Sequence, residues 1–181
     1  MPGPSHHTDG NGWDAATAAN PVRVSPFADL LGFDLVERSD GHAVVECTVV
    51  PAHANTRGIA HGGIMSALMD TACGGAVAYQ PSTGGRPAVT LSLTVTYLFP
   101  AHVGDRLRAE AFRCEAKETS SSEGKKGARS VGAGAPTGKR VGAGAPTRTV
   151  SSRVEVTNGS GQLLAVGLAT MRLKPLPHEV A

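Results

Sequence analysis

The chain has 181 residues, which is enough for one domain with a sizeable hydrophobic core. Only 4% of the residues are aromatic, and 23 glycines and 12 prolines indicate an aliphatic core with long loops or tails. The formal net charge of +2 argues against strong nucleic-acid binding. No apolar stretch is long enough to cross a membrane, and no secretory signal is evident. Three cysteines without a CxxC or metal-ligand spacing favour reduced thiols and a cytoplasmic location.

The first predicted elements are a short helix and a β-hairpin. Ser25 followed by proline predicts a helix over residues 26–31, with the serine as its cap. Two strands are predicted over residues 33–37 and 42–50, because the Asp40-Gly41 pair between them is typical of a hairpin turn.

A long helix is predicted over residues 62–79, opened by the sequence His61-Gly62-Gly63. One side of this helix is bulky and apolar and is expected to pack on a sheet; it carries Ile64, Met65, Leu68, Ala72, Ala76 and Tyr79. The other side carries Asp70, nine residues after the histidine, in a shallow trough formed by Gly63, Ser66, Ala67, Cys73, Gly74 and Val77.

Asp70 is the candidate reactive group, because a carboxylate among apolar neighbours is costly to bury without a purpose. The free amides at a helix start can hold a negatively polarised oxygen, so this segment favours acyl-transfer chemistry. Asp70 and Gly63 lie about 10 Å apart along the helix, which implies that a second chain supplies one of them. The alternative is that Asp70 is a satisfied polar group at a subunit contact.

Four strands are predicted after the helix, over residues 89–99, 105–118, 148–157 and 162–174. The first alternates strictly, and its buried face is expected to hold Leu91, Leu93, Val95, Tyr97 and Phe99. The second changes its apolar phase near Ala111-Phe112, which suggests a β-bulge.

Residues 119–147 interrupt this pattern with a Gly/Ala/Pro/Ser/Lys segment, in which VGAGAPT occurs at 131–137 and again at 141–147. The sequence therefore predicts a flexible insert, whose five basic residues are available to an anionic ligand. The chain divides into a disordered tail (residues 1–24), one domain (25–174) and a second tail (175–181). The expected fold class is α+β, with an antiparallel sheet wrapped around one long central helix.

The order of elements and the motifs together resemble the hotdog-fold thioesterases, and within them the PaaI-like group. The resemblance spans about residues 25–174, apart from the insert. The matching residues are Asn55, Gly58, His61-Gly62-Gly63, Asp70-Thr71-Ala72, Thr90, Tyr97, Pro100 and Gly104-Asp105.

The resemblance implies how an acyl-CoA thioester would be hydrolysed. The Gly63 amide would polarise the thioester carbonyl, and Asp70 from the partner subunit would act as nucleophile or general base. Asn55 would orient the amide region or the water, His61 would shape the helix start, and Thr90 would lie near the reacting water. The substrate trough would be lined by Gly62, Ser66, Ala67, Cys73 and Gly74.

The predicted function is therefore a homodimeric or homotetrameric acyl-CoA thioesterase with sites shared between subunits. The thioester of coenzyme A is its substrate, and no metal, other cofactor, nucleic acid or membrane is implied. A non-catalytic acyl-CoA-binding module and a hydratase or dehydratase on the same fold are the alternatives.

Overall fold

The computed structural model describes residues 25–79, 85–114 and 148–174. These residues form a short helix, a long helix and one six-stranded sheet, whose strands are antiparallel in the order β1-β2-β4-β5-β6-β3. The elements are α2 (Pro26–Leu30), β1 (Asp34–Ser39), β2 (His42–Thr48), the 3-10 helix η1 (Pro51–His53), α3 (Gly62–Ala78), β3 (Ala88–Tyr97), β4 (Arg106–Cys114), β5 (Arg148–Thr157) and β6 (Leu163–Leu173).

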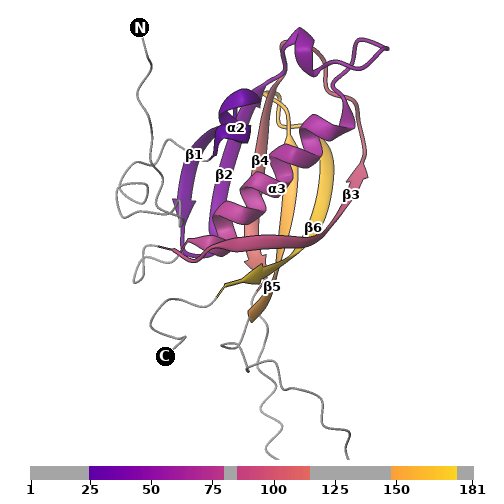
Figure 1. Cartoon of the computed structure of the whole chain (residues 1–181). Coiled ribbons are helices and arrows are strands. Elements are labelled where there is room, and N and C mark those ends of the chain that lie inside the picture. Colours follow the sequence, from indigo (N-terminus) through magenta and orange to yellow (C-terminus); the bar gives the residue numbers. More distant parts are fainter. Residues whose placement is uncertain (1–24, 80–84, 115–147, 175–181) are drawn as a thin grey trace, which may run out of the picture.

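The sheet curls around α3, with β1 and β3 at its two edges (Figure 1). The predicted α+β class, an antiparallel sheet wrapped around one long helix, is confirmed. The predicted tails over residues 1–24 and 175–181 lie outside the described residues. So does the predicted insert over residues 119–147.

The start of α2 has the predicted cap. The Ser25 Oγ accepts a hydrogen bond from the amide of Ala28 at 3.1 Å, and Pro26 occupies the first turn. Gly32 follows the helix with a φ of +65°, a left-handed conformation that suits glycine at a helix end.

The long helix α3 is buried over more of its circumference than the sequence pattern predicts. Cys73 and Val77, which that pattern places in the open trough, are both fully buried. The Cys73 Sγ lies 4.0 Å from the carbonyl oxygen of Ser152 on β5. The prediction is wrong for these two residues because the curled sheet covers the flanks of the helix as well as one face. Gly75 marks a close approach of α3 to β2, since a Cβ there would meet the Ala43 Cβ at 3.0 Å.

The edge strand β3 does not bury one continuous face. Its register with β6 shifts between Thr90 and Ser92, at a bulge or irregularity. Leu93 and Val95 pack against the core, whereas Leu91 is 47% exposed. Tyr97 and Phe99 of the predicted buried face are also about half exposed, at 47% and 52%. The shift matters for the site, because it lets the Thr90 side chain reach α3.

The bulge predicted near Ala111-Phe112 is absent. The register of β4 is continuous with β2 from Arg106 to Phe112 and with β5 from Arg108 to Cys114. The apolar phase changes because Phe112 lies on the outer face of the sheet. There its ring packs against His42, with centroids 4.7 Å apart, and the Arg153 guanidinium lies 4.6 Å from its centroid. Residues 115–118 of the predicted strand lie outside the described residues.

Candidate active site

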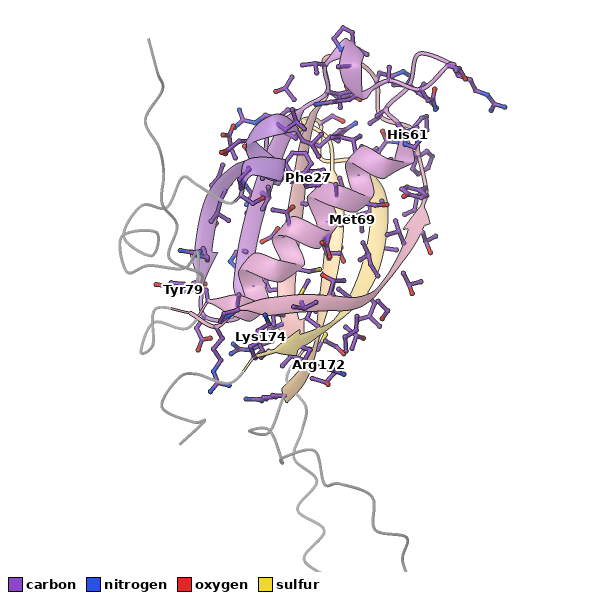
Figure 2. All side chains as sticks on the ribbon, in the orientation of Figure 1. Phe27, His61, Met69, Tyr79, Arg172 and Lys174 are labelled. Atoms are coloured by element: carbon purple, nitrogen blue, oxygen red, sulfur yellow. The ribbon has the colours of Figure 1, made fainter. Side chains whose placement is uncertain are left out.

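The amino end of α3 is capped by its own histidine. His61 is the N-cap residue in an extended conformation, and its Nδ1 accepts a hydrogen bond from the Gly63 amide at 2.9 Å. Figure 2 shows His61 at this end of the helix and Tyr79 at the other. The arrangement requires an unprotonated Nδ1. The Gly63 amide, which the family resemblance assigns to the thioester carbonyl, is therefore already occupied within the chain.

The neighbouring amide of Gly62 has no acceptor among the described residues. Gly62 lines a cavity of about 330 Å³ together with Asn55 and Tyr97. A helix-start N–H without a partner is the donor type that stabilises developing negative charge on oxygen. The Gly62 amide is therefore a second candidate donor beside the predicted Gly63 amide.

Asn55 lines the same cavity, and its side chain also takes part in the loop before α3. Its Oδ1 accepts from the Arg57 amide at 2.8 Å, and its own backbone amide donates to the carbonyl of Ile59 at 2.8 Å. These bonds fix the loop before α3, in which Gly58 has a φ of +76°. The Asn55 NH₂ group has no acceptor among the described residues, and it can only donate.

Asp70 is half-buried on the outward side of α3, two turns beyond the helix start. The Thr90 Oγ1 donates a hydrogen bond to the Asp70 Oδ1 at 2.7 Å. The structure thus brings Asp70 and Thr90 together, and within the described residues the second carboxylate oxygen accepts no hydrogen bond. Asp70 and Gly62 are separated by about 12 Å along the axis of the helix, at 1.5 Å per residue.

The remaining predicted trough residues divide into three groups. Ser66 and Gly62 both form hydrogen bonds with the Tyr97 hydroxyl. Ala67 lines a second cavity, of about 350 Å³, with His61 and Gly63. Gly74 is half-buried and Cys73 is in the core, and neither lines one of these two cavities at the helix start.

Tyr97 is the site residue that the sequence reasoning missed. It is among the residues that match the family, but the sequence pattern places it only on the buried face of a strand. Its hydroxyl lies 2.5 Å from the Ser66 Oγ and donates to the carbonyl oxygen of Gly62 at 2.9 Å. A tyrosine at the end of an edge strand, beside a glycine-rich helix start, was the available signal.

The buried cysteines are poor nucleophiles. Burial raises the pKa of Cys47 to about 11, and the charge of Asp34 adds to this effect. Burial likewise raises the pKa of Cys73 to about 12. Both thiols therefore stay protonated near neutral pH, although the Cys47 Sγ lies 4.0 Å from the His53 Nδ1.

Two absences hold for the described ranges 25–79, 85–114 and 148–174. No helix there is long and apolar enough to cross a membrane. Nor do three or more His, Cys, Asp or Glu side chains gather there in a group that would hold a metal ion.

Comparison with known proteins points to the thioesterases. Residues 57–121 match the thioesterase superfamily model. The acyl-coenzyme A thioesterase PaaI of Escherichia coli is 37% identical over 93 residues, which are 51% of this chain and 64% of that protein. A putative esterase of Archaeoglobus fulgidus is 34% identical over 83 residues, 46% of this chain and 51% of that protein. The chain thus spans about half to two thirds of the length of these curated relatives.

Solved structures extend the likeness beyond the matched segment. A single-residue mutant of the phenylacetic acid degradation protein PaaI from Thermus thermophilus superposes with a TM-score of 0.59 at 27% identity, over 83% of this chain and 100% of that one. The protein smu.793 of Streptococcus mutans, bound to acetyl CoA, gives a TM-score of 0.56 at 26% identity, over 78% and 88% of the two chains.

The described residues adopt the hotdog fold, and the chain is similar to thioesterases that share this fold. Within that class, the resemblance to the PaaI-like hotdog thioesterases is confirmed.

Proposed function

We propose that this chain is an acyl-CoA thioesterase, which hydrolyses an acyl-CoA thioester to the free acid and coenzyme A. The observation that carries the proposal is the Asp70 carboxylate, held by Thr90 at 2.7 Å on the outward side of a helix whose Gly62 amide has no acceptor among the described residues. The thioesterase match over residues 57–121 and the neighbour bound to acetyl CoA support the same chemistry and substrate.

In the proposed reaction, the Gly62 amide and the Asn55 NH₂ group donate to the thioester oxygen and stabilise the charge that develops on it. Asp70 acts either as the nucleophile or as the base that takes a proton from water. Attack on the carbonyl carbon breaks the carbon–sulfur bond. The thiol of coenzyme A leaves with a proton, and water supplies the oxygen of the acid.

The site is proposed to form between two copies of the chain, in a homodimer or homotetramer. Asp70 and Gly62 of one chain are about 12 Å apart, too far for one carbonyl group to contact both. The free edge of β3 and the half-exposed apolar residues Leu91, Leu98 and Phe99 along it suit a contact with a second copy. One chain would then supply Asn55 and Gly62, and its partner would supply Asp70 and Thr90.

The decisive experiment is a hydrolysis screen over aromatic, short-chain and long-chain acyl-CoA thioesters, with thiol release as the readout. The wild-type chain is expected to hydrolyse at least one class, and Asp70→Asn to lose at least about 10²-fold in turnover while still binding the substrate. Hydrolysis of no thioester, or near wild-type turnover by Asp70→Asn, would contradict the proposal.

The proposed chemistry uses only amide donors, a carboxylate and water, so chelators are expected to leave turnover unchanged. The cytoplasmic location is proposed on the sequence alone, from the spacing of the three cysteines.

A further inference from the structure

The Tyr97 hydroxyl connects β3 to the first turn of α3 through two hydrogen bonds. It donates its single proton to the carbonyl oxygen of Gly62 at 2.9 Å. The Ser66 Oγ, 2.5 Å away, must then be the donor of the second bond, because a hydroxyl group has only one hydrogen. The three groups form a directed chain from Ser66 through Tyr97 to Gly62, in which each bond polarises the next.

The peptide group between Gly62 and Gly63 is held at both ends. Tyr97 binds its carbonyl oxygen, and the His61 Nδ1 binds its N–H at 2.9 Å. Tyr97 also approaches position 62 closely, since a Cβ there would lie 3.2 Å from both the Cζ and the Oη of the tyrosine. Fixing this peptide fixes the backbone of Gly62 and hence the direction of its own amide.

Stability of the core does not account for the tyrosine. Tyr97 is 47% exposed and belongs to an edge strand, so its ring buries little apolar surface. The same strand carries Thr90, whose hydroxyl holds the Asp70 carboxylate. One strand therefore contacts both groups that the proposed reaction uses, at positions seven residues apart.

We infer that Tyr97, supported by Ser66, is a positioning residue that holds the Gly62 amide in the direction needed to stabilise the thioester oxyanion. The inference rests on the proposed function. Donors that are already aimed at the developing charge need no reorganisation during the reaction, so a peptide released from Tyr97 would stabilise the transition state less well and leave ground-state binding nearly unchanged.

The kinetic test compares Tyr97→Phe, Ser66→Ala and the double variant with Tyr79→Phe. The control removes the hydroxyl of a tyrosine at the far end of α3, where the ring lies under the Arg38 guanidinium. Tyr97→Phe is expected to lower kcat about tenfold with KM and Tm near wild type. The double variant should match Tyr97→Phe, because Ser66 acts through the tyrosine. Tyr79→Phe should match wild type.

A second measurement does not depend on activity. In protein labelled with ¹⁵N-glycine, amide hydrogen exchange at Gly63 should be several-fold faster in Tyr97→Phe than in Tyr79→Phe, because the peptide has lost one of the two bonds that hold it. If the wild-type chain hydrolyses no thioester, the proposed function fails while this measurement still decides whether the hydroxyl holds the peptide. Unchanged exchange, or a Tyr97→Phe variant with wild-type kcat, would overturn the inference.

Discussion

A mixture of two inactive variants should recover activity if the site is shared between chains. The two variants are Asp70→Asn and Asn55→Asp, which change charge with little change in size. In Asp70→Asn, Thr90 still has an oxygen to which it can donate. In Asn55→Asp, an Oδ1 still accepts from the Arg57 amide, so the loop before α3 keeps its turn. Both variants are therefore expected to fold.

The expected recovery follows from the geometry of the site. Each variant alone should lose at least about 10²-fold in turnover. Asp70→Asn loses the base or nucleophile, and Asn55→Asp places a negative carboxylate beside the oxyanion. The roughly 12 Å between Asp70 and Gly62 puts the two defects in different halves of each shared site. A hybrid dimer then has one intact site and one doubly defective site. Random pairing makes about half of the dimers hybrids, so the mixture should reach about a quarter of wild-type activity.

The assay is thiol release from the best acyl-CoA, measured on chains that are coexpressed with two different affinity tags. Hybrids isolated on both tags in succession should show about half of wild-type turnover. Mixing each variant with itself provides the control, since no intact site can form. Activity of the isolated hybrids at the level of the two parents, or full activity of a demonstrated wild-type monomer, would refute the shared site.

Three further predictions concern other parts of the chain. Thr90→Val removes the bond to Asp70 and should lower kcat roughly tenfold. Tm should also fall, because a hydrogen bond to a charged group contributes about 1.5–3 kcal/mol to stability; equal kcat would show that the reaction does not use the bond. Replacing residues 121–146 by an Asn-Gly turn should leave Tm equal or slightly higher, since the free-energy cost of loop closure changes by only about 0.6 kcal/mol per doubling of length. A large fall in Tm would show packed structure there. If the basic residues of that segment bind coenzyme A, KM should rise and the rise should shrink at high salt. In native protein at pH 8, Cys47 and Cys73 should react slowly with a thiol-specific reagent, because their pKa values are raised to about 11 and 12. Both should react fast after unfolding, and rapid labelling of native Cys73 would contradict its burial.

The amino-acid sequence by itself determined the elements and the candidate residues. Caps, turns and periodicity act over a few neighbouring residues, so the Ser25 cap, the long helix beginning at Gly62 and the strands on either side of it could be predicted locally. The same local pattern singled out Asp70, because a carboxylate is conspicuous in an apolar helix. The family resemblance added Thr90, which the structure places against that carboxylate.

Only the tertiary structure decided which atoms are free and which are already occupied. The choice between the Gly62 and Gly63 amides depends on where the His61 imidazole turns, and the role of Tyr97 depends on a strand that meets the helix 35 residues later in the chain. The burial of Cys73 follows from how far the sheet curls around α3. Neither the direction of the His61 ring nor the contacts between distant segments leave a periodic trace in the sequence.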